Sequence, residues 1–580
     1  RGALWRHDPP RDRHQQSERR LFPKATAASG PRWRLAAMVL TLAPIAAAQQ
    51  GPVSERAFFA PVEVSLVNVE VFAADATGRP IAGLISSDFE IQEDGGPVTI
   101  THFYAAPRVA RDRTGAVLEP FAEPPEVSQA LHLIIFFDDN NLSTNRRRRA
   151  LDAVNDWLPL LPDGVQVMIV RWSGTMQVVQ QFTNDVRAVG SALQELGQSS
   201  SRSLQAERDR IRNDMRRYSD TAAIAYVQHI RAYAQSATEQ TLAMMRGLDR
   251  LVRSAAGLRG RKAILLVTDG IDTSPGADLI RAWQQIFPDT ARTTDIAPSL
   301  EAQRINVSES LDKLIEGANT RRVTVHAIAA TGSNTTTSIS ADRDVDVTLR
   351  GGFDSRSQYD AGRVEPYLAR LTGGRVLGND RKLVHQLSEL AAELDGYYSL
   401  AYRPSHTGDG QYHRIKVRVA DDDVALRHRD GYRDTRHVDR ISDRTLTAAA
   451  LGITDNPLAI SAEGQEQQPR DDGMYLVPIV IKVPLSQLSL LPQTTDHEGR
   501  VSVTVAVRDD RGGLSDIQRR EYPIQIPHDQ FLSALSQNAE FIMGLVMREG
   551  PHRVGVGVRD ELGNVDSTAT LDVHVGDHDL

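Results

Sequence analysis

Oxygen-bearing side chains follow two strongly apolar segments that lie far apart in the sequence. Residues 131–137 and 263–267 are apolar runs of the kind found in buried parallel strands, and polar residues follow each of them. The candidate ligands of this group are Asp139, Asn141, Ser143 and Asp269. Because the carboxyl ends of parallel strands meet at one edge of a sheet, these side chains can share one site. Oxygen-only ligands suit a hard divalent cation, so the sequence predicts a site for Mg²⁺, with Mn²⁺ or Ca²⁺ as alternatives.

The surrounding elements follow the pattern of an α/β domain over residues 129–436. Its apolar strands are expected at 131–137, 164–172, 263–268 and 323–329. Helical spacing of apolar residues after the first strand predicts a helix that begins close to the polar cluster. Strands alternating with helices indicate a doubly wound, mostly parallel, Rossmann-like sheet. The polar helical stretch at about 185–257 is longer than an ordinary crossover, so we expect it to project as a helical insertion.

Strands that alternate apolar and polar residues predict β modules on both sides of this domain. We expect a small N-terminal β domain at 62–106, a Pro-rich linker at 107–128, and a β hairpin extension of the α/β domain at 397–432. Alternation returns at 501–507 and 554–558, and each run ends in a turn. Residues 437–580 are therefore expected to form a β-sandwich-like domain.

The N-terminal 48 residues indicate export. A basic stretch at 32–34 precedes an apolar run at 35–47 and small residues that end at Ala48. This order is typical of a secretory signal peptide, with cleavage near Ala48, after a disordered leader. We expect a secreted or periplasmic protein that keeps no transmembrane span after signal removal, because the run is too short for an ordinary span.

Composition excludes several classes of function. The chain has 580 residues, enough for several domains, and a net charge of −8, which disfavours a nucleic-acid binder. It contains no cysteine, which removes thiolate metal ligands and cysteine nucleophiles. The motifs of α/β hydrolases, P-loop and dinucleotide enzymes and zinc proteases are also absent from suitable positions. We therefore expect that the protein is not an enzyme.

Three other motifs favour simpler interpretations. The acidic residues at 342–346 lack the glycine and glutamate of a calcium loop, and residues 333–362 around them predict a mobile surface loop. His406 and His413 flank a Gly-Asp-Gly sequence that is better explained by a hairpin turn than by a metal pair. The arginines at 146–149 are expected to form a solvated helix face.

Several stretches of the chain resemble von Willebrand factor type A (VWA) domain proteins and, among them, the acidobacterial-type VWA-related secreted proteins. The matching stretches are 83–95, the strand that ends in Asp138 and Asp139, Leu265-Leu-Val-Thr-Asp-Gly270, 371–375, 396–404 and 427–432. The resemblance covers roughly residues 62–432 and leaves out the C-terminal domain. It implies a VWA-like α/β domain that takes part in protein–protein interaction or cell adhesion.

The resemblance also implies a metal-ion-dependent adhesion site (MIDAS). In such a site an Asp-x-Ser-x-Ser loop, a threonine from a second loop and an aspartate from a third hold the ion. If Asp139 leads the loop, Asn141 and Ser143 take the serine positions, whereas if Asp138 leads, Leu142 falls on a ligand position. Asp269 matches the third-loop aspartate.

The threonine of the adhesion site has no clear counterpart in the sequence. Thr238 and Thr241 stand at a plausible distance before the strand that leads to Asp269, but both lie in a helical stretch. A simpler interpretation of the whole cluster is that Asn141 or Ser143 caps the helix that follows.

Together these observations predict a non-catalytic interaction protein, exported from the cytoplasm. Its partner is expected to be a protein that offers an acidic side chain to complete the coordination of the ion. The alternative is a structural envelope protein with a metal-free VWA scaffold, which binds through its β modules.

Overall fold

The computed structural model describes residues 66–75, 78–106, 130–198, 204–215, 223–293, 297–329, 364–378, 381–421, 423–435 and 437–576. The predicted signal peptide, linker and mobile loop, with its acidic residues at 342–346, lie outside these ranges. The chain divides into two units, Arg1–Ala60 and Pro61–Leu580, and the second is described by itself. Within the described ranges, no helix combines the length and the apolar character needed to cross a membrane.

A six-stranded sheet forms the centre of the α/β domain. In spatial order its strands are β10 (Val376–Gly378), β9 (Val323–Ala329), β8 (Arg261–Val267), β5 (Leu131–Asp138), β6 (Gln166–Trp172) and β7 (Met176–Thr183). All neighbours run parallel except β7, which is antiparallel to β6 at one edge. The fold prediction is confirmed at this level: the chain combines a mostly parallel sheet in an α/β domain with several antiparallel sheets.

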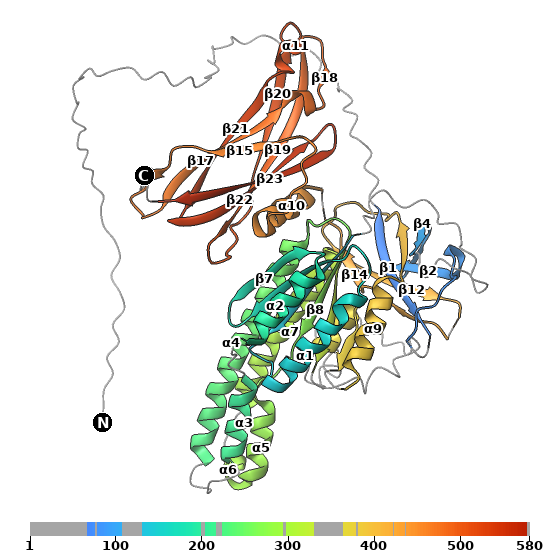
Figure 1. Cartoon of the computed structure of the whole chain (residues 1–580), viewed down its shortest axis with the longest axis vertical. Coiled ribbons are helices and arrows are strands. Elements are labelled where there is room, and N and C mark those ends of the chain that lie inside the picture. Colours follow the sequence, from blue (N-terminus) through green and yellow to red (C-terminus); the bar gives the residue numbers. More distant parts are fainter. Residues whose placement is uncertain are drawn as a thin grey trace, which may run out of the picture. The chain divides into compact units, whose positions relative to one another are not determined.

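Helices cover both faces of this sheet (Figure 1). One face packs against α1 (Thr144–Trp157), α2 (Val186–Gln198) and α9 (Leu383–Leu394). The other packs against α4 (Ala223–Ala255), α7 (Ala297–Thr320) and α8 (Glu365–Leu371). Side chains of β5 alternate between the two cores, which explains why residues 131–137 are almost wholly apolar.

The predicted helical insertion contains α2, α3 (Leu204–Met215) and α4. Its far end also includes two helices from beyond β8, namely α5 (Ala277–Ile286) and α6 (Pro288–Thr293). Buried apolar residues of α3, α4 and α5 form a core of their own around Trp283. The insertion is thus a packed helical unit built from two separate segments of the chain.

The N-terminal β domain is built from two distant parts of the chain. One sheet contains β13 (Ala425–Arg427), β1 (Val67–Ala74), β11 (Tyr398–Tyr402) and β4 (Ile100–Ala105). The other contains β14 (Gly431–Arg433), β12 (Tyr412–Val419), β2 (Phe89–Glu93) and β3 (Gly96–Val98), with η1 (Ser86–Asp88) just before β2.

The assignment of residues 397–432 to the α/β domain is therefore corrected. Their strands pair with β1, β2 and β4 and share one apolar core with them. Hydrogen bonding between strands does not depend on sequence distance, so these strands, which join two different sheets and do not form a hairpin, complete the domain that residues 67–105 begin.

The C-terminal domain starts with α10 (His437–Leu451) and continues as two antiparallel sheets around one apolar core. The first sheet contains β15 (Ser461–Gly464), β16 (Gln468–Pro469), β17 (Tyr475–Pro484) and β21 (Asn538–Met547). The second contains β18 (Leu491–Pro492), β19 (Asp496–Asp509), β20 (Gln518–Pro527), β22 (Gly550–Asp560) and β23 (Val565–Val575). The short α11 (Phe531–Ala534) precedes β21.

Candidate functional site

Asp138, the last residue of β5, lies at the carboxyl edge of the six-stranded sheet and is fully buried. Its Oδ2 accepts hydrogen bonds from Asn141 Nδ2 at 2.7 Å and from Thr268 Oγ1 at 3.1 Å. Its Oδ1 is buried and accepts no hydrogen bond from the residues that the structure describes. Burial raises the pKa of Asp138 from 3.8 to about 6, against the opposing effect of these two hydrogen bonds.

Asp269, which follows β8, approaches the same loop. Its Oδ2 accepts a hydrogen bond from the backbone nitrogen of Ser143 at 2.7 Å and lies 3.6 Å from Arg146 Nη1. Ser143 is the residue before α1, and its side chain makes no capping hydrogen bond. The carboxylates of Asp138 and Asp269 thus both contact the 141–143 loop from two strand ends, whereas the sequence analysis had paired Asp139 with Asp269.

Asp139 has a different role from the one predicted for it. Both of its oxygens accept hydrogen bonds from arginines: Arg147 Nε lies 2.7 Å from Oδ1, and Arg171 Nε lies 2.7 Å from Oδ2. Arg147 also donates to the backbone oxygen of Leu196 and is only 6% exposed, so it does not belong to a solvated helix face. Asp139 is therefore paired with two arginines, whereas Asp138 contacts Asn141 and Thr268.

The two candidate threonines lie on α4, and both are buried. The hydroxyl of Thr238 donates to the backbone oxygen of Ala234 within the same helix, at 2.7 Å. Thr268 is the threonine that contacts the aspartate cluster, and our sequence analysis did not single it out. Its position next to Asp269, at the end of an apolar run, was the signal that could have identified it.

Some of the polar side chains at this edge are suitable ligands for a hard cation such as Mg²⁺, and others are not. Asp138, Thr268 and Asp269 supply oxygen atoms, and among the described residues nothing donates a hydrogen bond to the buried Oδ1 of Asp138. Asp139 does not fit because two guanidinium groups neutralise it. Arg146 beside Asp269 adds a positive charge with which a cation would compete.

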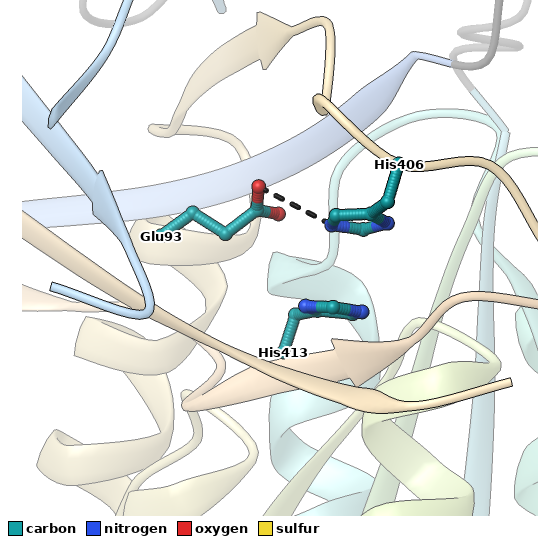
Figure 2. Close-up of side chains that lie close together, drawn as sticks. All are labelled: Glu93, His406 and His413. Atoms are coloured by element: carbon teal, nitrogen blue, oxygen red, sulfur yellow. Dashed lines mark ion pairs between the residues drawn. The ribbon is translucent and has the colours of Figure 1, made fainter. Parts of the chain in front are cut away.

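A second cluster lies in the N-terminal β domain and consists of histidines and carboxylates (Figure 2). The rings of His406 and His413 stack with centroids 3.6 Å apart and planes 12° from parallel. Among the described residues, two groups of three or more potential metal ligands lie within 4.8 Å of one another, and both are here. They are Glu93, His406 and His413, and His406, Asp409 and Asp434.

This cluster was missed by the sequence analysis, which favoured a simple turn between the two histidines. The segment is not a hairpin turn, because it joins β11 to β12, which lie in different sheets, and its residues Gly410 and Gln411 form backbone hydrogen bonds with Asp434. The residues that complete the cluster, however, lie at the end of β2 and after β14, far away in the sequence. Only the His-x-x-Asp-x-x-x-His spacing of residues 406–413 was a local signal.

Comparison of the sequence with protein-family models and with curated proteins gives no match. Similar solved structures include BatB from Bacteroides thetaiotaomicron, at 11% identity over 45% of this chain and 98% of that chain, with a TM-score of 0.22. A von Willebrand factor type A protein from Catenulispora acidiphila shows 8% identity over 89% of this chain and 74% of that chain, with a TM-score of 0.25.

The PilB minor pilin from Streptococcus sanguinis shows 13% identity over 47% of this chain and 63% of that chain, with a TM-score of 0.24. At these identities and TM-scores, the likenesses carry no argument about function. What the protein does must therefore be inferred from its own residues.

Proposed function

We propose that this chain is a secreted or periplasmic, non-catalytic protein-binding module. Its VWA-like α/β domain binds a protein ligand at the carboxyl edge of the six-stranded sheet, in adhesion or in assembly of the cell envelope. The flanking β domains act as spacers or as additional contacts.

One observation carries this proposal: polar side chains from two strand ends meet the loop before α1 at this edge. Asp138 ends β5 and Asp269 follows β8, and both carboxylates bond to residues of the 141–143 loop. In open α/β sheets, ligands bind outside the carboxyl ends of the strands. The strand order supports this location, because β5 and β8 are neighbours in the sheet although the chain leaves β5 toward β6 on its other side.

We propose further that this edge binds Mg²⁺, or Mn²⁺ or Ca²⁺ in its place. Asp138 and Asp269 are the carboxylate ligands, and Thr268 offers a hydroxyl oxygen. Asn141 and Ser143 hold the two carboxylates through nitrogen atoms, the side-chain amide of Asn141 and the backbone amide of Ser143. The bound ion supplies a positive charge to which an acidic side chain of the partner is attracted. Asp139 holds the loop in place through its two arginines and is not a ligand.

The test is thermal unfolding of the full chain in chelator and in excess Mg²⁺. An ion that binds only the folded state stabilises it by about 2.7 kcal/mol at a hundredfold excess over Kd, so the Tm of the wild type should rise. Asp138→Asn and Asp269→Asn should each abolish the rise. Asp139→Asn is the matched control: it should lower the Tm but leave the Mg²⁺-dependent rise intact.

The outcome separates this function from its alternative, a metal-free scaffold. The arginines around Asp139 and Arg146 beside Asp269 favour that alternative, because they already neutralise part of the edge. Identical Tm values with chelator and with Mg²⁺ would support the scaffold. A pull-down from the envelope fraction with wild type and Asp138→Asn, each with and without chelator, then tests whether partner binding depends on the ion.

A further inference from the structure

Four residues of the N-terminal β domain converge on the loop between β11 and β12. His406 and Asp409 lie on this loop, His413 lies on β12, and Asp434 follows β14. Two backbone bonds fix Asp434 against the loop: Gly410 N donates to Asp434 O at 3.0 Å, and Asp434 N donates to Gln411 O at 3.0 Å. The side chains are therefore held by paired backbone and do not depend on a free loop for their positions.

The spacing of the side-chain atoms suits a shared ion. His406 Nδ1 lies 3.0 Å from Asp434 Oδ2, and one ligand atom from each of His406, Asp409 and Asp434 lies within 4.8 Å of the others. A tetrahedral ion with bonds of about 2.0–2.2 Å separates its ligand atoms by about 3.3–3.6 Å. Only small side-chain rotations are needed to reach that arrangement.

The opposite nitrogen of His406 faces a carboxylate that is itself held in place. Figure 2 shows this pair, in which His406 Nε2 lies 3.4 Å from Glu93 Oε2. The hydroxyls of Tyr402 and Tyr432 donate to Glu93 Oε1 at 2.7 and 2.8 Å. Metal-bound histidines usually have such a carboxylate behind them, because it fixes the tautomer and turns the other nitrogen toward the ion.

His413 supports the site from the other side. Its Nε2 lies 3.2 Å from both oxygens of Asp409, and its Nδ1 lies 2.8 Å from Asp94 Oδ2. Because its ring is stacked on that of His406, the in-plane lone pairs of the two rings run side by side and do not converge. His413 is thus placed to hold Asp409, while His406 offers its Nδ1 to the ion.

The cluster contains more carboxylates than imidazoles, which favours the binding of a cation. Four carboxylates, those of Glu93, Asp94, Asp409 and Asp434, surround two imidazoles. Within the described ranges, the ion pairs found for these carboxylates are all with histidines. The four carboxylates outnumber the two imidazoles, so a divalent ion bound among them would add positive charge where carboxylates prevail.

We propose that His406 Nδ1, Asp409 and Asp434 bind a divalent transition-metal ion such as Zn²⁺. An imidazole ligand selects such ions over Mg²⁺ and Ca²⁺, which prefer oxygen alone. Glu93 and His413 are positioning residues that orient His406 and Asp409. Asp409 is 35% exposed at its side chain, so a water molecule can occupy the remaining coordination position. The site is separate from the Mg²⁺ site proposed for the sheet edge and does not depend on it.

Calorimetric titration of the chelator-treated full chain with Zn²⁺ tests the assignment. We expect one tight site in the wild type, a loss of affinity of at least about 100-fold in His406→Gln and Asp434→Asn, and a loss of about 10–100-fold in His413→Gln, as for residues behind a ligand. His102→Gln, which replaces an exposed histidine on β4 of the same domain, should bind like the wild type. Asp138→Asn should also bind Zn²⁺ with the affinity of the wild type, whether or not the sheet edge binds Mg²⁺.

A second measurement needs no variant. Zn²⁺ should protect His406 of the wild type from diethyl pyrocarbonate, measured by mass spectrometry of its peptide, while His102 stays reactive. Unchanged Zn²⁺ affinity in His406→Gln, or equal modification of His406 with and without Zn²⁺, would overturn the proposal and leave the two histidines as partners in ordinary ion pairs.

Discussion

The sheet edge of the α/β domain and the histidine cluster of the β domain both bury carboxylates beside strand ends, but they balance the negative charge differently. At the sheet edge, the guanidinium groups of Arg147 and Arg171 hold Asp139. In the β domain, imidazoles of His406 and His413 face the carboxylates. A guanidinium offers only donors to a carboxylate, whereas an imidazole nitrogen can also bind a metal ion.

The largest effect that tests this comparison is expected for Asp139→Ala. The substitution leaves the buried guanidinium of Arg147 and that of Arg171 without their shared carboxylate, which should lower the free energy of unfolding by about 3–5 kcal/mol. Urea unfolding of the full chain measures the loss. Asp152→Ala, an exposed change on α1, is the control and should stay within about 0.5 kcal/mol of the wild type. Equal losses in the two variants would mean that Asp139 is not a structural anchor.

The second effect concerns Asp138. Burial raises the pKa of this carboxyl group from 3.8 to about 6. Between pH 3.8 and about pH 6, Asp138 is protonated more often in the folded chain than in the unfolded chain. The contribution of Asp138 to the free energy of unfolding therefore increases as the pH falls through the pKa of the folded state. In chelator, the stability of the wild type relative to Asp138→Asn should therefore increase by about 3 kcal/mol from about pH 7 to about pH 4. A constant difference in urea unfolding across this range would contradict the assignment of a buried, cation-free carboxylate.

A smaller effect is expected in the β domain for Tyr402→Phe. The substitution removes one of two hydrogen bonds to the buried Glu93 carboxylate, and bonds to charged groups contribute about 1.5–3 kcal/mol. Tyr398→Phe on the same strand is the matched control, because the Tyr398 hydroxyl bonds only to neutral backbone groups: it donates to Ile81 O and accepts from Leu84 N, and each bond should contribute only about 0.5–1.5 kcal/mol. Chemical denaturation measures both variants, and a loss per hydrogen bond that is larger in the control would contradict the stronger bond to the Glu93 carboxylate.

The strands of the central sheet were readable from the sequence because burial on both faces leaves a continuous apolar run. Residues 131–137 and 323–329 coincide with β5 and β9 almost to the residue. The helical stretch at 185–257 also corresponds to real helices, but its partners from beyond β8 were not foreseen. Periodicity reports which face of an element is buried, and it does not report which distant element covers that face.

The candidate sites also combine features that the sequence predicted with features that it did not. The sequence placed Asp139 and Asp269 at one edge, yet Asp138 and Asp139 could not be told apart, because adjacent side chains of a strand end point in opposite directions and only packing decides which one faces the edge. The assignment of residues 397–432 to the α/β domain was wrong for a related reason. The sequence of a strand does not indicate which other strands it pairs with.

The amino-acid order by itself determined that this chain has an α/β domain with β modules around it, and that polar groups gather where two of its buried strands end. The tertiary structure alone decided which carboxylate is neutralised by Arg147 and Arg171, and which meets Asn141 and Thr268. It also brought Glu93 and Asp434 to the histidines of a distant loop. The physical reason is that burial patterns are local and repeat along the chain, whereas charge pairing depends on side chains that become neighbours only after the sheets have formed.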